Sequence, residues 1–403
     1  MDRTIMVLPG TEWQVPLIRK IKETGHRVVV VNPATDSPGF KFADAYLIAD
    51  IFDREKVLRF AHEQHVSAVL SDECDIVMNW IAELGEIVGG KALDRSSAAL
   101  FTDKYMMREF CKRHALPAPN CVKCSNPGEA VQLFKRENAP IIIKPLDSNS
   151  SHGVFVCRSE QQIIAHYKEA ESFSRKSKNV LAESFIDGPE FTVDGIKTPA
   201  GHYTLAISQK KHFAYNKSIA CELLFTHEND NYDYEALKAI NDTFVMKSSL
   251  AFGLTHAEYK YKNGQFFLIE IAARGGGNRI SSSICPFMSG HDTYSYLIDC
   301  ALGKIKETDF SVLTHCRQRA ALLKFFDIPV AEGRVTAIQG IEYLNSEPCI
   351  AEYKFNFKVG DAIREANSDS ARIGYYIALC EDKEHLERIK KSVEEKVKII
   401  IER

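Results

Sequence analysis

Short apolar segments alternate with amphipathic helices along the first hundred residues, and this alternation limits the fold more than any other feature. The pattern predicts strands at 4–8, 27–31, 45–48 and 68–70, and helices at 15–24, 54–65 and about 75–86. Strands joined by helices run parallel, with helices on both faces of their sheet. The first hundred residues therefore predict one α/β lobe.

The sequence changes character twice after this lobe. Residues 94–115 are predicted to be helical, and short strands then surround helices at 127–137 and 160–172, which is typical of a small α+β lid. Beyond residue 192, strands with hairpin signals precede helices at 234–251 and 291–302, a β-rich section at 319–380 and a helix from Lys383 to the end. A chain of 403 residues is long enough for two or three lobes with a cleft between them.

Composition narrows the class of ligand. The 51 Lys and Arg residues nearly balance the 54 Asp and Glu residues, so nothing indicates binding to nucleic acid or to an anionic membrane. No apolar run approaches the ~20 residues of a membrane span, and the first turn lacks the G-x-G-x-x-G motif of dinucleotide binding. A small-molecule substrate fits the chain better.

The cysteines favour a reducing compartment. Eleven of them are scattered along the chain, whose start lacks a secretory pattern, so we expect reduced thiols and a cytoplasmic location. Cys121 and Cys124 form a C-x-x-C pair. No second ligand pair lies near it, and packing is therefore a better interpretation than zinc binding.

Two segments have the character of nucleotide-binding elements. The apolar strand 141–145 carries Lys144 and precedes a polar turn that ends at Gly153, and such a lysine and turn suit a phosphate. A hairpin with a solvent-reaching lysine is the alternative. The segment 183–190 has an acid at each end, and its backbone groups can bind adenine, although solvent-facing strand acids explain it as well.

The strongest signal is a hairpin around Asn263 and Gly264, whose strands carry Glu258 and Glu270 near their outer ends. Because side chains alternate between faces, a simple two-residue loop would put the two glutamates on opposite faces. Two carboxylates on one face would instead suit magnesium, which commonly bridges carboxylates to nucleotide phosphates.

We therefore predict a bulged loop at 262–264 with a left-handed glycine. This register pairs Glu258 with Leu268 and His256 with Glu270, and it puts all four side chains on one face.

Arg274 follows the second glutamate by four residues and precedes three glycines at 275–277. Its fixed charge can stabilise phosphoryl oxygens, and the glycines let the backbone approach reacting atoms closely. A purely structural hairpin would carry apolar residues here.

Taken in order, these segments resemble the ATP-grasp superfamily over most of the chain. The resemblance implies an α/β ATP-grasp fold with a Rossmann-like parallel-sheet lobe at 1–100, an ATP-grasp domain at 101–310 that includes a small α+β lid at about 117–190, and a C-terminal α+β, β-rich part at 311–403. It also implies ATP and Mg²⁺ as cofactors, with Mn²⁺ as an alternative ion.

The resemblance assigns roles to single residues. Arg274 and Lys144 would be catalytic, and Glu258 and Glu270 would hold the metal. The implied nucleotide-binding residues are Lys104 and Lys144 at the phosphates, Ser148, Ser151 and Gly153 in the phosphate lid, Glu183, Ser184, Phe185 and Ile186 at adenine, Glu190 at ribose and Leu268 packed on adenine.

The chain departs from the superfamily pattern at one position. Many members have Glu-x-Asn-x-Arg at the end of the second hairpin strand, whereas this chain has Glu270-Ile-Ala272-Ala-Arg274. The missing Asn argues against the usual two-ion site. A small residue also occurs there in the branch that resembles L-amino-acid ligases and related carboxylate–amine ligases, and Gly333-Arg-Val and the segment 372–378 resemble that branch too.

The resemblance implies transfer of the γ-phosphoryl group of ATP to a carboxylate, followed by attack of an amine on the acyl phosphate. The expected partners are small-molecule carboxylates and amines, and analogy suggests a homodimer. Asp72 or Glu73 would bind an ammonium group and Arg279 a carboxylate, although exposed turn residues are an equal alternative. His256, His152 or a phosphate oxygen would accept the amine proton.

Three other functions stay open. A purine-pathway ligase or formate-dependent transformylase shares the same plan, and a small-molecule kinase would stop after phosphoryl transfer. A nucleotide-binding module without activity is the third.

Overall fold

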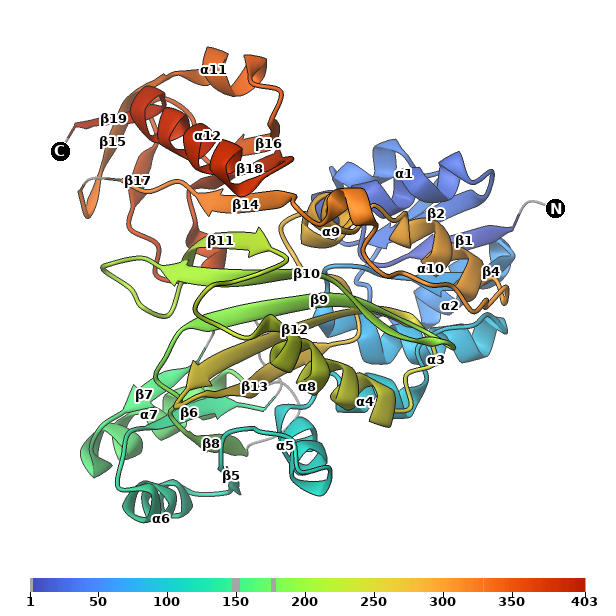
Figure 1. Cartoon of the computed structure of the whole chain (residues 1–403). Coiled ribbons are helices and arrows are strands. Elements are labelled where there is room, and N and C mark those ends of the chain that lie inside the picture. Colours follow the sequence, from blue (N-terminus) through green and yellow to red (C-terminus); the bar gives the residue numbers. More distant parts are fainter. Residues whose placement is uncertain (1–2, 147–152, 175–178, 329, 403) are drawn as a thin grey trace.

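The N-terminal lobe is a parallel sheet with helices on both faces (Figure 1). The computed structural model describes residues 3–146, 153–174, 179–328 and 330–402. Ile5 and Val7 of the first strand lie in one core with helix α1, whereas Met6 and Leu8 lie in a second core with α2 and α3. In the order β3-β2-β1-β4, the strands are β3 (Ala45–Ile48), β2 (Arg27–Asn32), β1 (Thr4–Val7) and β4 (Val66–Leu70), and the helices are α1 (Val15–Glu23), α2 (Arg54–Glu63) and α3 (Met78–Val88).

The helical stretch predicted at 94–115 is two helices, α4 (Arg95–Leu100) and α5 (Lys104–Arg113). The second helix begins after Asp103, whose side chain accepts a hydrogen bond from the backbone N–H of Met106. Capping at Asp103 fixes where α5 starts and so places Lys104 and Arg108 one turn apart on a buried face.

The lid is a four-stranded sheet covered by two helices, whose buried faces share one core with the strands. Its sheet runs in the order β5-β8-β6-β7, where β5 is Cys121–Cys124, β8 is Val180–Ser184, β6 is Ile141–Pro145 and β7 is Phe155–Cys157; its helices are α6 (Pro127–Glu137) and α7 (Glu160–Ser172). Cys124 is fully buried in this core.

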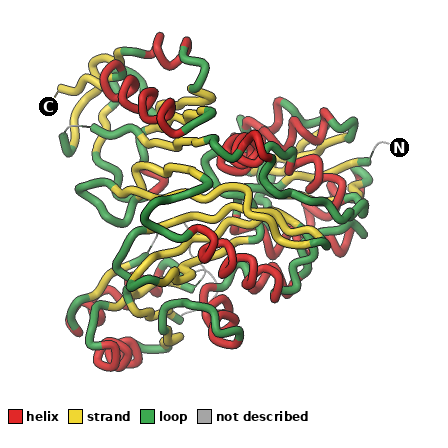
Figure 2. Tube along the Cα trace, viewed as in Figure 1, coloured by secondary structure: helices red, strands yellow, loops and turns green. Residues whose placement is uncertain are grey.

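An eight-stranded antiparallel sheet forms the centre of the molecule, and strands run through the middle of Figure 2 with helices toward the outside. Its order is β13 (Gln265–Ala272), β12 (Gly253–Lys262), β9 (Glu190–Thr198), β10 (Gly201–His212), β11 (Ala220–Thr226), β14 (Ala320–Phe325), β18 (Gly374–Cys380) and β16 (Ile350–Phe355). Helix α8 (Tyr234–Lys247) packs on one face, and α9 (Cys285–Ser289) and α10 (Thr293–Ala301) share the core of α1. One sheet therefore connects the ATP-grasp and C-terminal segments of the chain.

The C-terminal segment adds a small sheet and two helices beside this central sheet. The sheet has the order β17-β15-β19, with β17 (Ala362–Arg364), β15 (Glu332–Gln339) and β19 (Lys398–Glu402), and the helices are α11 (Ile341–Ser346) and α12 (Lys383–Lys396). The prediction that the last helix runs to the end is wrong. Val397 turns extended and the isoleucines at 399–401 form β19, because β-branched residues favour a strand.

The expected fold class is confirmed by this arrangement of a parallel-sheet lobe, a small lid and antiparallel sheets. Within the described residues, no helix is both long and apolar enough to cross a membrane.

Leu322 of β14 and Tyr376 of β18 lie in the same buried core, so their effects on stability can be compared directly. The Tyr376 hydroxyl is buried, with no hydrogen-bond partner among the described residues. Tyr376→Phe should therefore leave the free energy of unfolding within about 1 kcal/mol of wild type or raise it. Leu322→Ala should lower it by about 2–5 kcal/mol through the cavity that it leaves. Urea unfolding measures both changes in the free energy of unfolding. Equal losses in the two variants would mean that the Tyr376 hydroxyl makes a hydrogen bond in the folded protein.

Candidate active site

Glu258 and Glu270 lie directly opposite each other on strands β12 and β13. The predicted three-residue loop is wrong: Lys262 pairs with Gln265, and both loop residues, Asn263 and Gly264, have positive φ, which is typical of a two-residue hairpin turn. The register shifts further along, between Tyr259 and the glutamate before it. The two acids share a face because of that shift.

The register shift is a β-bulge whose extra residue is Ile269. Tyr259 pairs with Leu268, so Leu268 is buried in the core behind the sheet with 1% of its surface exposed. The prediction that Leu268 shares the face of Glu258 and Glu270 is therefore wrong.

Both glutamates line a cavity of about 700 Å³ between the central sheet, the N-terminal lobe and the C-terminal segment. Other charged or polar residues around the cavity include Glu12, Glu73, Asp75, Glu190, Thr192, Lys210, His212, His256, Arg274, Asn278, Asp369 and Arg372. A mixture of acids and cations at one cavity suits a ligand that carries both charges.

Each of the two glutamates has a lysine partner. The Lys104 ammonium lies 2.7 Å from Oε1 of Glu270, and the Lys210 ammonium lies 2.6 Å from Oε1 of Glu258 and 2.7 Å from Oε1 of Glu190. Burial would raise the pKa of Glu258, but Lys210 holds that pKa below its usual value. Both metal-ligand candidates are therefore carboxylates paired with cations that phosphate groups can also bind.

A buried ion triad connects α5 to the lid. Arg108 Nε lies 2.6 Å from one oxygen of Glu183, and Lys144 Nζ lies 2.5 Å from the other, with all three side chains at most 6% exposed. Burial would raise the pKa of Glu183, but Arg108 and Lys144 together lower it. Removing a single member of such a triad typically costs about 3–5 kcal/mol because it leaves a buried charge unpaired.

The triad carries one more positive than negative charge. Burial lowers the pKa of Lys144 more than its contact with Glu183 raises it, and Arg108 and Lys104 lower it further. A bound anion such as a phosphate group would offset this excess charge and favour the charged form of Lys144.

The segment that follows Glu183 joins the lid to the central sheet. The Ser184 N–H donates to the Asn120 carbonyl at 2.9 Å, and the Phe185 N–H donates to the Pro140 carbonyl at 3.1 Å. Ile186 is buried. These bonds fix the extended backbone that we predict to face adenine.

Two acids lie beside imidazoles at the cavity. Glu190 pairs with Lys210 and lies 3.4 Å from Nε2 of His212, and its pKa is lowered because these cations outweigh burial. His256 Nδ1 lies 2.8 Å from an Asp194 carboxylate oxygen, so Nε2 of this ring is the nitrogen left for a ligand.

Arg274 forms a bidentate ion pair with Asp75 of the N-terminal lobe, at 2.8 and 2.6 Å. Close approach requires glycine at the first two of the three positions after it. A Cβ on Gly275 would lie 2.6 Å from a carboxylate oxygen of Asp72, and a Cβ on Gly276 would lie 2.5 Å from one of Asp194. The loop after β13 is therefore clamped between two buried acids.

Asp72 and Glu73 have different surroundings. The Asp72 carboxylate accepts bonds from the Gly275 N–H, the Ser281 hydroxyl and the Tyr294 hydroxyl, so it is fully used in holding the loop. Glu73 lines the cavity, and its Oε2 is buried with no partner among the described residues. Glu73 is therefore the better of the two candidates for a ligand ammonium group.

Arg279, the predicted carboxylate ligand, links two parts of the chain. It donates to Glu352 of β16 and to the backbone carbonyl of Glu12, and it lies over the ring of Trp13. Lys354 also pairs with Glu12. These contacts close the cavity between the N-terminal lobe and β16.

The predicted residues of the turn before Gly153 lie outside the described part of the chain. Ser148, Ser151 and His152 lie outside the described residues. Gly153 is described, is buried and has a φ of 74°.

The structure adds Asp75, Arg108 and Lys210, which sequence reasoning missed. Arg108 follows Lys104 by one helical turn, and that spacing could have indicated a second cation on the same face. Arg274, the partner of Asp75, is 199 residues away in the sequence, and Glu258, a partner of Lys210, is 48 residues away. Neither pairing leaves a local signal.

Two family matches cover most of the second half of the chain. Residues 137–282 match the family described as the ATP-grasp domain, and residues 326–402 match the L-amino acid ligase C-terminal domain 2. With the fold and the site described above, these matches show that the chain contains an ATP-grasp domain, joined to a C-terminal domain of the kind found in L-amino acid ligases. The C-terminal match makes the chain similar to the L-amino-acid ligases at residues 326–402.

Individual relatives agree with this assignment. Dapdiamide A synthase of Enterobacter agglomerans is 24% identical over 290 residues, which cover 69% of this chain and 66%, just under two thirds, of that relative. A D-alanine–D-alanine ligase of Chromohalobacter salexigens is 26% identical over 117 residues, 27% of this chain and 36% of that one. The crystal structure of an L-amino acid ligase from Bacillus licheniformis has the same fold, with a TM-score of 0.82 at 17% identity over 100% of this chain and 99% of that one.

The buried carboxyl of Glu73 should make the stability of the protein depend on pH. Burial, followed by the neighbouring Asp72, raises the pKa of Glu73 well above its usual value of 4.5. The folded protein then holds this proton more tightly than the unfolded chain, so the carboxyl costs stability as pH rises above about 4.5. Glu73→Gln should melt above wild type at neutral and mildly alkaline pH and equal to it near pH 4.5. Thermal unfolding across this range measures the difference, with exposed Glu235→Gln as control; a loss of stability at every pH would contradict the assignment.

Proposed function

We propose that the protein is an ATP-dependent carboxylate–amine ligase that forms an amide or peptide-like bond through an acyl phosphate and releases ADP and phosphate. The observation that carries the proposal is the pairing of Glu258 with Glu270 across the β12–β13 hairpin, at a cavity that also contains Arg274 and Lys210. Acids, cations and space for a second substrate are thus at one place.

The nucleotide phosphates would bind where the lysines now meet the glutamates. Lys104 and Lys144 are buried cations beside Glu270 and Glu183, and an incoming triphosphate offers them oxygens in exchange. Positioning and charge neutralisation dominate phosphoryl transfer, so these lysines and Arg274 can supply most of what the step needs. Asp75 holds the Arg274 guanidinium in a fixed orientation for this purpose.

Magnesium fits the carboxylate pair. Glu258 and Glu270 are opposed and both line the cavity, and their lysine partners show that each is accessible to a cation. Ala272 stands at the position where many relatives of this fold have an Asn ligand, so we propose that these two carboxylates are the protein ligands. Glu258 and Glu270 would hold a magnesium ion, whose charge would offset the negative charge that develops on the phosphates.

We infer that the substrates are amino acids or similar zwitterions. The unpartnered Oε2 of Glu73 supports binding of an ammonium group, and Arg372, a cation that lines the same cavity, is a candidate for a carboxylate. Arg279 lies over the ring of Trp13, which also lines the cavity, and is a second candidate. The His256 ring, oriented by Asp194, or a phosphate oxygen would accept the amine proton. On family analogy alone, we also infer a homodimer and a cytoplasmic location.

The experiment is ADP and phosphate release with magnesium-ATP and pairs of amino acids or other small carboxylates and amines. Release should require both substrates, with equal amounts of ADP, phosphate and amide product. Phosphorylated product without an amine would instead favour a kinase, and turnover only with formate and a ribonucleotide amine would favour a purine-pathway enzyme.

Two glutamate variants make this assay specific. Glu270→Gln should lower kcat at least about 100-fold because it removes a charge that acts in the transition state. Exposed Glu235→Gln, with the same change of charge, should keep full activity. Unchanged kcat in Glu270→Gln would contradict the proposed site.

A further inference from the structure

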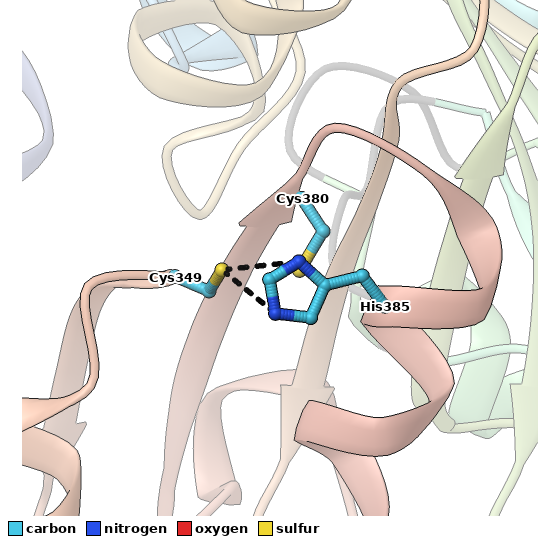
Figure 3. A group of neighbouring side chains, drawn as sticks. All are labelled: Cys349, Cys380 and His385. Carbon is cyan, nitrogen blue, oxygen red and sulfur yellow. Dashed lines mark hydrogen bonds between the residues drawn. The ribbon is translucent and has the colours of Figure 1, made fainter.

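Two thiols and one imidazole converge at the outer end of the C-terminal segment (Figure 3). Sγ of Cys349 lies 3.8 Å from Nε2 and 4.0 Å from Nδ1 of His385. One donor atom from each of Cys349, Cys380 and His385 lies within 4.8 Å of the other two. Within the described residues, this is the one group of three or more potential metal ligands so close together.

The spacing is near that of a tetrahedral metal site. Zinc lies about 2.3 Å from a thiolate and about 2.0–2.1 Å from an imidazole nitrogen, so neighbouring ligand atoms are about 3.5–3.8 Å apart. The 3.8 Å between Cys349 Sγ and His385 Nε2 already matches that range. All three ligand atoms lie within 4.8 Å of one another. Bringing even the most distant pair to the spacing of a zinc site therefore requires the two side chains to approach each other by about 1 Å.

The backbone holds the three ligands in place. Cys349 immediately precedes β16, Cys380 is the last residue of β18, and the Leu379 N–H donates to the Cys349 carbonyl at 2.8 Å. His385 lies in the first turn of α12, where its N–H donates to the capping carboxylate of Asp382 at 2.7 Å. Adjacent strands and a capped helix start thus bring Cys349 close to Cys380 and His385, which follow it by 31 and 36 residues.

We propose that Cys349, Cys380 and His385 bind a thiophilic divalent cation, with zinc as the best match to a ligand set of two thiolates and one imidazole. Water completes the tetrahedron at the fourth position. None of the three residues lines the 700 Å³ cavity, so the site is separate from the one proposed for catalysis. A bound ion would connect β16, β18 and α12, and it would stabilise the C-terminal segment.

Binding exchanges two protons for one ion. Cys349 and Cys380 are free cysteines, and a cysteine must lose its thiol proton to ligate a metal ion. Each S–H bond breaks as an S–metal bond forms, and two protons go to solvent. The affinity for zinc should therefore rise with pH. The two thiolates balance the charge of the ion, and the N-terminal end of α12 favours that negative charge.

Cobalt substitution is the test, on the whole reduced protein under anaerobic conditions. One equivalent of Co²⁺ should give thiolate-to-cobalt charge-transfer absorption and the intense visible bands of tetrahedral cobalt, and zinc should abolish both. Zinc should also raise the Tm by several degrees, because a ligand that binds only the folded state stabilises it.

Cys349→Ser and His385→Gln change ligands that are only half-buried, so both variants should fold. Each should weaken zinc binding at least about tenfold and lose the Tm shift. Cys221→Ser, which removes another half-buried thiol on β11, should bind as wild type does. Absence of cobalt bands in the reduced wild type, or their persistence in either ligand variant, would overturn the proposal. A Cys349–Cys380 disulfide on air oxidation, without metal binding by the reduced form, would overturn it in favour of a redox pair.

Discussion

The account of this molecule depends on one irregularity in a hairpin. The extra residue at Ile269 changes the register of β13 against β12, and it places Glu258 directly opposite Glu270 on the cavity face. In a regular hairpin closed by the two-residue turn at Asn263 and Gly264, the acids would face opposite sides of the sheet. β-Bulges are frequent where a strand must re-aim a side chain toward an active site. Here the bulge brings two ordinary strand glutamates onto one face, which the proposed magnesium site requires.

Charge is balanced around this pair by exchangeable partners. Without ligand, Lys210 lies against Glu258 and Lys104 against Glu270, so neither carboxylate is an isolated charge. A magnesium-bound nucleotide carries both kinds of partner: its phosphates can take the lysines and its metal can take the glutamates. In the proposed complex, one set of ion pairs would be exchanged for another, and no charge would be buried alone, which would be costly. The Arg108–Glu183–Lys144 triad extends the same principle to the lid.

The sequence predicts what is periodic or local in this fold. The alternation along 4–70 gives the parallel sheet, and the lid helices at 127–137 and 160–172 are found at the predicted bounds. The sequence does not predict the features that depend on contacts between distant segments. The bulge at Ile269 leaves no sequence mark because Ile is ordinary in a strand, and so the loop at 262–264 was assigned the irregularity instead. The pairing of Arg274 with Asp75 likewise joins segments 199 residues apart.

The most direct test of the exchange of ion pairs is calorimetric binding of a non-hydrolysable ATP analogue, with and without magnesium. If Glu258 and Glu270 hold the metal, magnesium should raise the affinity of wild type at least about tenfold. In the double variant Glu258→Gln, Glu270→Gln, the cations around the phosphates should keep the analogue bound, but magnesium should no longer change its affinity. A magnesium effect of the same size in the double variant would contradict the account, because the metal would then be held by other ligands.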